Sequence, residues 1–247
     1  MPQTKLDIAT PDGTAEAFLF TPSSGAGPWP GVVYLSDIFG VRPAYHDMAQ
    51  RLADKGYAVL LPNAFYRAGP LPLFDFAPQF GEERTMKRFG ELRVGLLNEM
   101  MGPDGARYAD FLLSRPEVKR GKCGIVGYCF TGQMAVHAAA QAPGTFAAAL
   151  SFHGGNLYTD EPDSPHLLLP KIKARLYFGH AANDHSLSAD AIARLEEALR
   201  TWGGRFESET YPAAHGWCVP GRVGIYDEAQ ADRAFAKMVE LLDAKLK

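Results

Sequence analysis

The chain has 247 residues, of which 47% are hydrophobic and 21% charged, and its formal net charge is -3 at pH 7. This composition is typical of a globular protein and unlike that of disordered or collagen-like chains. Basic residues are not in excess, so the sequence gives no electrostatic reason to expect nucleic acid or an anionic membrane as a partner. We expect a small-molecule partner instead, and the oligomeric state stays open.

Length is compatible with one α/β domain over residues 1–247. No apolar run is long enough to cross a bilayer, and the first residues lack the apolar stretch of a signal peptide, so a cytoplasmic location is expected. Three cysteines, Cys123, Cys129 and Cys218, form an odd and sparse set that argues against a disulfide framework. We expect Cys123, at the start of a predicted strand, and Cys218, in a loop, to be structural.

Short apolar runs and helical patterns alternate along the chain. The turn Pro11–Gly13 predicts a hairpin at an antiparallel sheet edge. Runs rich in β-branched and aromatic residues predict strands at Ala17–Phe20, Gly31–Leu35, Tyr57–Leu61, Gly124–Gly127, Ala147–Phe152, Arg175–Gly179 and Phe206–Tyr211. Helical spacing predicts helices at Pro43–Lys55, Leu92–Leu113, Gln133–Gln141, Ala189–Trp202 and Asp227–Leu246. The alternation predicts a mainly parallel sheet with helices on both faces, and ligands at the carboxyl ends of its strands.

Residues 66–85 form the least regular stretch and are rich in proline, glycine and phenylalanine. Long loops within compact domains are often lids or binding loops. We therefore predict a cap over the active site here, with an ordinary surface excursion as the alternative.

The strongest functional signal is Cys129, which lies where an apolar strand ends and an alanine-rich helix begins. A strand, turn and helix with small neighbours is typical of a nucleophile elbow, which lifts its central side chain clear of the sheet. Gly127 is suitably small, whereas Thr131 is bulkier than the usual glycine, for which Gly132 could compensate. A helix N-terminus also favours a thiolate. The alternative is that Cys129 is a small buried hydrophobic residue.

A thiol nucleophile needs a base, and His215 follows the last predicted strand, at the sheet edge expected for Cys129. Asp184 follows the preceding strand and is the predicted carboxylate partner of the histidine, with Asp190 as the competitor. The chain order of nucleophile, acid and base is the order described for α/β-hydrolases.

His180, Asp184 and His185 are metal-type ligands at short spacing, but no second cluster accompanies them. We therefore expect neither a metal nor a cofactor.

An oxyanion hole needs two preorganised donors. The amide after the nucleophile belongs to Phe130, and the loop after an early strand places Ile38 as the second donor. The glycine-rich stretch His153–Gly155 is an alternative, but it follows the strand after the nucleophile instead of preceding it.

With these residues in place, the sequence resembles the dienelactone hydrolase family over nearly its whole length. The similar pieces are LSDIFGVRP, YAVLLPNAFYR, GIVGYCFTG, FGHAANDH and YPAAHGW. The resemblance implies an α/β-hydrolase fold, hydrolysis of a lactone or other ester, no metal, and a catalytic trio of Cys129, Asp184 and His215.

The chain also departs from the pattern of that family, whose enol-lactone enzymes carry a glutamate in the oxyanion loop that interacts with the cysteine. Here Asp37 stands in its place and is the predicted support of the nucleophile. Those enzymes bind a substrate carboxylate with an arginine in the cap region, for which Arg84 and Arg88 are candidates, and with a second one shortly after the base histidine. Val219 occupies the corresponding position, with Arg222 nearby but out of register.

Trp217, from the YPAAHGW motif, completes the predicted substrate-binding set. The alternative function is a weakly catalytic or non-catalytic small-molecule binding protein on the same fold. Thr131 and Asp37 favour that alternative.

Overall fold

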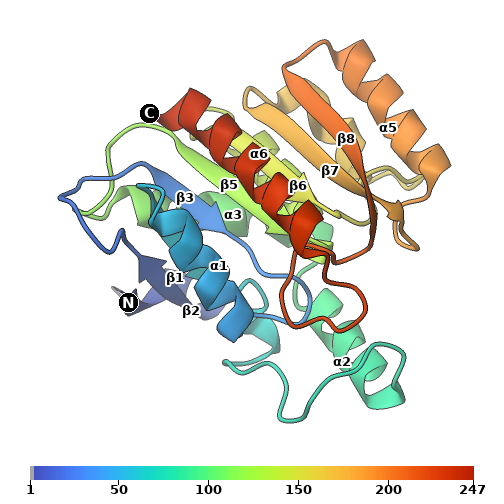
Figure 1. The fold of residues 1–247 in the computed structure, drawn as a ribbon, viewed down its shortest axis with the longest axis horizontal. Coiled ribbons are helices and arrows are strands. Elements are labelled where there is room, and N and C mark those ends of the chain that lie inside the picture. The colour runs from blue at the N-terminus through green and yellow to red at the C-terminus, as the bar shows by residue number, and fades with distance from the viewer. Residues whose placement is uncertain (1–2) are drawn as a thin grey trace.

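The computed structural model describes residues 3–247 and contains one eight-stranded sheet in the order β1-β2-β4-β3-β5-β6-β7-β8 (Figure 1). The strands are β1 Gln3–Thr10, β2 Gly13–Phe20, β3 Gly31–Tyr34, β4 Ala58–Pro62, β5 Cys123–Tyr128, β6 Phe146–Phe152, β7 Arg175–Asn183 and β8 Phe206–Ala214. All seven predicted strands are present. The strand order and the mostly parallel pairing are those of the α/β-hydrolase fold.

The first two strands form the predicted hairpin at one edge of the sheet. Thr10 pairs with Gly13, and Gly13 has φ 140°, a value that glycine tolerates without steric cost. β2 runs antiparallel to β1 and to β4, whereas the pairs from β4 through β3, β5, β6 and β7 to β8 are parallel. The carboxyl ends of these parallel strands therefore meet at one edge of the sheet.

Helices cover both faces of the sheet, as predicted. They are α1 Pro43–Ala53, α2 Glu83–Val94, α3 Asn98–Leu113, α4 Phe130–Gln141, α5 Ala189–Trp202 and α6 Glu228–Leu246. Helices α1 and α6 pack on one face, and α3, α4 and α5 on the other (Figure 1). Every residue of β3, β4 and β5 is buried, which explains why these strands are continuously apolar in sequence.

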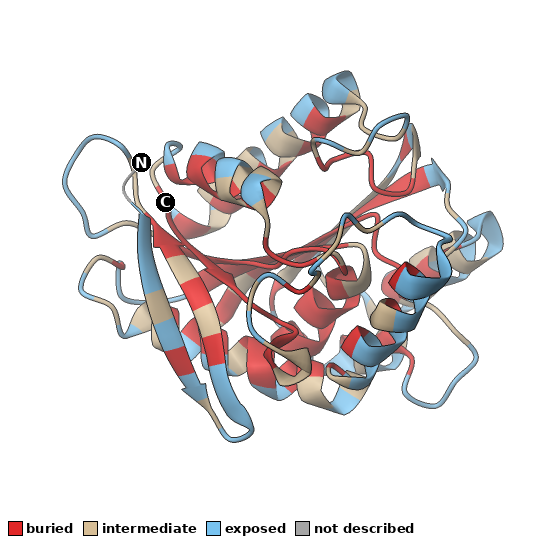
Figure 2. Ribbon diagram, turned by 90° about the horizontal axis from the view of Figure 1, so that it is seen from below, coloured by how far each residue is buried: buried red, intermediate tan, exposed pale blue. Residues whose placement is uncertain are grey.

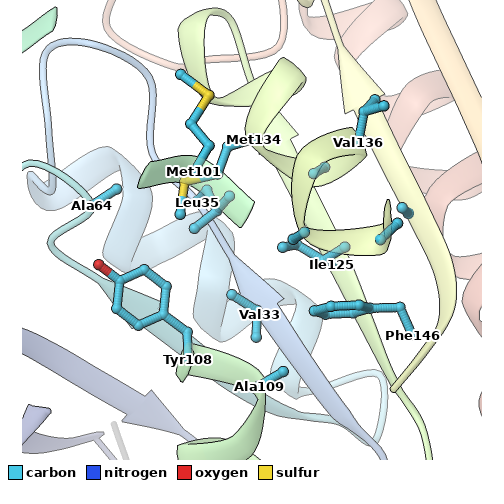
Figure 3. Close-up of a cluster of buried hydrophobic side chains, with 14 of the residues drawn as sticks. Val33, Leu35, Ala64, Met101, Tyr108, Ala109, Ile125, Met134, Val136 and Phe146 are labelled. Carbon is cyan, nitrogen blue, oxygen red and sulfur yellow. The ribbon is translucent and has the colours of Figure 1, made fainter. Parts of the chain in front are cut away.

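The hydrophobic core consists of two clusters, one on each side of the sheet. The central strands run as a buried layer between helices whose outer surfaces are exposed, whereas the edge strand β1 is largely exposed (Figure 2). In the cluster under α3 and α4, side chains from β3 and β5, such as Val33 and Ile125, face Tyr108 and Met134 of the helices (Figure 3). This cluster supports the ends of β3 and β5, which lead into the functional site.

The predicted helix Leu92–Leu113 is wrong in one respect, because the chain forms two helices there. Helix α2 ends at Val94 and α3 begins at Asn98. Gly95 is the C-cap of α2, and Leu96 is fully buried while Leu97 is extended. Glycine is a poor helix former, and burying Leu96 requires the chain to turn inward.

The predicted cap over residues 66–85, called the cap segment below, begins with a single 3-10 turn at Tyr66–Ala68 and is irregular up to Glu82. Its last three residues already belong to α2. The cap segment lies at the same end of the molecule as the loop between β8 and α6 (Figure 1).

Among residues 3–247, we find no helix that combines the length and the apolar character needed to span a bilayer.

Candidate active site

Cys129 lies in the tight turn between β5 and α4. Its backbone has φ 54° and ψ -123°, a conformation that non-glycine residues rarely adopt. The turn is possible because Gly127 lacks a side chain: a Cβ there would lie 2.2 Å from the Thr131 carbonyl oxygen. Gly132 allows a second close approach, since a Cβ there would lie 2.7 Å from the Gly154 Cα. The strained turn therefore presents the sulfur at the carboxyl end of β5.

The side chains of Cys129, His215 and Asp184 form a continuous hydrogen-bonded chain. His215 follows β8 directly, and its Nε2 lies 3.0 Å from the Cys129 Sγ. Asp184 follows β7 directly, and its Oδ2 lies 2.8 Å from the His215 Nδ1. The structure thus brings together the three residues that the sequence analysis selected from loops after three different strands.

Ser186 stabilises the Asp184 carboxylate. Its amide and its hydroxyl donate to the Asp184 Oδ1 at 2.8 and 2.6 Å, and the hydroxyl oxygen lies 3.2 Å from the His215 Nδ1. The carboxylate is therefore fixed on both oxygens, which holds the imidazole in one orientation.

The electrostatics of the site favour an anionic carboxylate beside an imidazole that readily holds a proton. Burial alone would lower the pKa of His215, but its hydrogen bonds to Asp184 and Cys129 outweigh burial and raise this pKa to about 10. Burial alone would raise the pKa of Asp184, but the hydrogen bonds from His215 and Ser186 lower it overall. An imidazole in this state can accept the proton of the Cys129 thiol.

The competing carboxylate Asp190 and the candidate metal ligand His180 make no hydrogen bond to the trio Cys129, His215 and Asp184 among residues 3–247. Asp190 is exposed in the first turn of α5. His180 is buried, and its Nε2 lies 3.2 Å from the Ser208 hydroxyl. Across residues 3–247, histidine, cysteine and acidic side chains form no group of three that could hold a metal ion.

Two backbone amides are available beside the sulfur. Phe130 is the first residue of α4, and its amide has no intrahelical acceptor. The Ile38 amide has no acceptor among residues 3–247, and both residues line the cavity that contains Cys129. The Gly155 amide, from the alternative glycine-rich stretch, donates to the Cys129 carbonyl oxygen at 3.3 Å and is already occupied.

The sulfur and the imidazole open into a cavity of about 330 Å³, which is within the size range of small-molecule sites. The cavity is lined by Ile38, Phe39, Phe80, Phe89, Arg93, Cys129, Phe130, Gly155, Asn156, Asn183, His185, Ser186, Ala214, His215, Arg222 and Ile225. The cap segment contributes Phe80, whose ring centroid lies 5.3 Å from that of His185, another residue of the wall. Aromatic side chains thus make up much of the wall.

A second cavity adjoins the first. Phe39, Phe80, Arg222 and Ile225 line both. The second cavity has a volume of about 820 Å³ and continues between the cap segment, the start of α1 and the loop before α6. Its walls are rich in proline and phenylalanine, so the space leading to the sulfur is elongated and largely apolar.

The structure places the two predicted cap-region arginines outside this cavity. Arg84 is exposed, pairs with Asp75 at 2.8 Å and lies over the Phe76 ring. Arg88 donates to the carbonyl oxygens of Leu73 and Ala68, at 3.0 and 2.9 Å, and so braces the cap segment. These contacts differ from the expected role in substrate binding.

Trp217 and Asp37 also differ from expectation. Trp217 is fully buried, with its ring 4.9 Å from that of Tyr211 and 5.1 Å from that of His153, so it lies behind the site. Asp37 is fully buried and pairs with Arg42, and no contact with Cys129 is found. With one methylene fewer than glutamate, its carboxylate remains within its own loop.

Several residues of the site were missed by the sequence analysis. Ser186 follows Asp184 in an Asp-x-Ser pattern that predicts a side-chain-to-backbone turn, and this signal could have identified it. Arg93 lines the cavity and Arg42 lies beside it, and the sequence analysis assigned a role to neither. Arg222, noted in the sequence only as out of register with the family's second arginine, also lines the cavity.

A model of the dienelactone hydrolase family matches residues 15–246 of the chain. The chain belongs to the dienelactone hydrolase family. A Synechocystis protein provisionally named a carboxymethylenebutenolidase is 28% identical over 225 residues, which cover 90% of this chain and 88% of that protein. A carboxymethylenebutenolidase from Rhodococcus opacus is 28% identical over 193 residues, covering 78% and 71% of the two chains.

Solved structures agree on the fold of this family member. The crystal structure of a provisionally assigned dienelactone hydrolase from Klebsiella pneumoniae superposes with a TM-score of 0.84 at 23% identity and covers 98% of each chain. A dienelactone hydrolase from Anabaena variabilis gives a TM-score of 0.68 at 19% identity over the whole of both chains. The α/β-hydrolase fold and membership of a hydrolase family are therefore established.

Proposed function

We propose that this dienelactone hydrolase family member hydrolyses a lactone or another carboxylic ester through an acyl-enzyme intermediate on Cys129. The observation that carries the proposal is the hydrogen-bonded chain from the Cys129 Sγ through His215 to Asp184, at 3.0 and 2.8 Å. The sulfur at one end of this hydrogen-bonded series lies in the same cavity as Ile38 and Phe130, whose amides are the proposed oxyanion donors.

In the proposed reaction, His215 takes the proton of the Cys129 thiol and the sulfur attacks the carbonyl carbon of the ester. The carbonyl oxygen becomes an oxyanion and accepts hydrogen bonds from the Ile38 and Phe130 amides. When the C–O bond breaks, His215 returns its proton to the departing alkoxide. In a lactone, this step opens the ring and the alcohol stays attached to the acyl group.

Water then completes the cycle. His215 takes a proton from a water molecule, and the hydroxide attacks the thioester carbon. The C–S bond breaks, the sulfur recovers the proton from His215, and the carboxylic acid leaves. Asp184 keeps one imidazole nitrogen protonated throughout, so the other can alternate between base and acid.

The residues that line the two cavities favour a substrate that is largely apolar and carries a negative charge. Arg93 and Arg222 line the first cavity, and neither forms an ion pair with a carboxylate among residues 3–247. A guanidinium group binds a carboxylate through two parallel hydrogen bonds. The names of the curated relatives refer to a carboxymethylene-substituted butenolide, a lactone that carries a carboxyl group, and support the same substrate class.

The proposal is tested with Cys129→Ala on a panel of aryl esters and lactones. We expect kcat/KM to fall by about three orders of magnitude or more, since the nucleophile is removed. Cys218→Ala is the matched control, because Cys218 is also a free cysteine but is buried outside the site. Its hydrolysis rates should equal those of the wild type.

Full turnover by Cys129→Ala would contradict a thiol nucleophile. The alternative of a binding protein predicts negligible hydrolysis by the wild type across the panel, together with tight ligand binding in calorimetry.

A further inference from the structure

The two amides of the proposed oxyanion hole come from two separate turns. Ile38 lies in the turn after β3, called the oxyanion loop below and comprising residues 36–42, and Phe130 lies in the turn after β5. β3 and β5 are parallel neighbours, with Val33 opposite Ile125. Both amides lie beyond the paired parts of these strands. Strand pairing alone therefore does not fix their spacing, which depends on the contacts between the two turns.

The Thr131 hydroxyl joins them. Thr131 is fully buried, and its Oγ1 lies 2.9 Å from the Ser36 carbonyl oxygen and 3.1 Å from that of Tyr128. It also accepts a hydrogen bond from the Tyr128 amide at 3.1 Å. Thr131 adjoins Phe130, and Ser36 is two residues from Ile38, so this hydroxyl connects the two donors through short stretches of backbone.

The Asp37 carboxylate fixes the rest of the oxyanion loop. Its Oδ1 accepts from the Phe39 amide at 3.0 Å and from the Arg42 Nη1 at 2.6 Å, and its Oδ2 accepts from the Arg42 Nη2 at 2.9 Å. The Arg42 Nη1 also donates to the Gly40 carbonyl oxygen at 3.1 Å. Both carboxylate oxygens are therefore engaged within the loop.

The backbone of the same loop is equally constrained. The Asp37 amide donates to the Tyr45 hydroxyl at 2.9 Å, and the Gly40 amide donates to the Asp37 carbonyl oxygen at 2.9 Å. The Phe39 amide is bound to the Asp37 carboxylate, so the amides on both sides of Ile38 and that of Gly40 are all occupied. The Ile38 amide remains without an acceptor among residues 3–247 and lies at the wall of the reactive cavity.

We infer that Thr131, Asp37 and Arg42 are positioning residues that together hold the Ile38 and Phe130 amides at the spacing an oxyanion requires. The inference rests on the proposed function. It assigns Asp37 to the oxyanion loop instead of to the sulfur, and it gives a role to the threonine that stands where a nucleophile elbow usually has a glycine. A buried ion pair contributes little net stability, so geometry is the better reason for its presence.

Two reactions of the same sulfur separate this role from support of the nucleophile. Alkylation by iodoacetamide forms the C–S bond and expels iodide, so no oxyanion develops. Capture of phenylacetaldehyde forms a C–S bond while the carbonyl π electrons pass to oxygen, which takes the thiol proton by way of His215. Only the second reaction places the oxygen of a tetrahedral carbon, anionic until it is protonated, in the oxyanion hole, so only it should depend on the positioning residues.

For Thr131→Val, which keeps the shape and removes the hydroxyl, we expect aldehyde affinity and kcat for esters to fall about 10- to 100-fold. The iodoacetamide rate should stay within about twofold of the wild type, because the sulfur and His215 are untouched. Thr131→Ser retains the hydroxyl and should recover most of both losses. Thermal unfolding of each variant shows whether the protein is folded at the assay temperature.

For Asp37→Asn, aldehyde capture should weaken in the same way, and alkylation should not slow. A carboxylate that assisted the sulfur would give the opposite result, a slower alkylation. Asp104→Asn is the matched control: Asp104 forms an equally buried, two-bond pair with Arg67, at 2.6 and 3.0 Å, away from the reactive cavity. It should leave both reactions unchanged.

The inference is overturned if Thr131→Val captures the aldehyde as tightly as the wild type, or if alkylation and aldehyde capture fall together. Failure of the proposed function gives a different pattern. A wild type that captures the aldehyde but hydrolyses no ester would refute the hydrolase proposal, and the effect of Thr131→Val on aldehyde affinity would still decide the positioning role.

Discussion

His215 lies between a carboxylate and a sulfur, and its protonation depends on both. The Asp184 hydrogen bond raises the pKa of the imidazole, so Asp184→Asn should lower this pKa and leave the ring neutral at pH values where the wild type is protonated. NMR titration of the ring Cε1 proton measures the change. The wild-type resonance should titrate near pH 10.

Asp184→Asn should also slow ester hydrolysis about 100- to 10,000-fold, because the imidazole of His215 loses its fixed tautomer. Asp190→Asn is the control, since Asp190 is exposed and makes no contact with His215. An unchanged titration of His215 in Asp184→Asn would refute the role assigned to Asp184.

Gly127 makes the turn around Cys129 possible, because any side chain there would collide with the backbone of Thr131. We expect Gly127→Ala to lower the free energy of unfolding by about 1–3 kcal/mol, as overpacking of a rigid site does. Urea denaturation measures it. Gly90→Ala is the control, because Gly90 is at an exposed position of helix α2 where an added Cβ meets nothing within 4 Å. This substitution should raise the free energy of unfolding by up to about 1 kcal/mol. Equal effects of the two substitutions would contradict the steric argument.

The sequence predicted site residues correctly where a side chain suited to catalysis directly follows a strand. Cys129, Asp184 and His215 each follow a predicted strand, and parallel strands end at one edge of the sheet, so their meeting could be predicted. Asp37 and Trp217 were assigned by family position, and their contacts depend on side-chain reach and packing that a sequence does not encode locally. The role of Arg222 likewise depends on the path of a long loop.

At the scale of the elements, we expect the cap segment and the second cavity, which adjoins the cavity around the sulfur, to select among substrates. Ala44, in the first turn of α1, lines the second cavity only. Ala44→Trp should fill that space and lower kcat/KM for biphenyl esters about tenfold, equivalent to about 1.4 kcal/mol. Hydrolysis of 4-nitrophenyl acetate should stay within about twofold.

Ala44→Ser is the control for this change, since it adds one small atom. An equal loss for short and long esters in Ala44→Trp would show that the second cavity does not receive the substrate.

Element boundaries were the least predictable part of the fold. The hydrophobic pattern continues through Leu96 and Leu97, so residues 92–113 read as one helix, although Gly95 ends α2 and the chain turns before α3. Parallel strands were easier to identify, because burial on both faces makes them continuously apolar.

At the scale of the whole molecule, the two core clusters support the sheet from opposite sides, and the site lies at one edge. Leu112 is fully buried in the cluster under α3, away from the cavity. Leu112→Ala should lower the free energy of unfolding by about 2–5 kcal/mol in urea denaturation. The specific activity of the folded protein at 25 °C should be unchanged. A loss of activity without a loss of stability would show that this cluster affects the site directly.

The reactive sulfur, its imidazole and the carboxylate all stand on turns that leave the central sheet, whereas residues 69–82 contribute only Phe80 to the chamber around them. We therefore expect the chemistry and the substrate selection to depend on separate segments of the chain. Exchanging that stretch for one of another length or composition offers a practical way to redirect the protein toward new esters while its reactive centre stays intact.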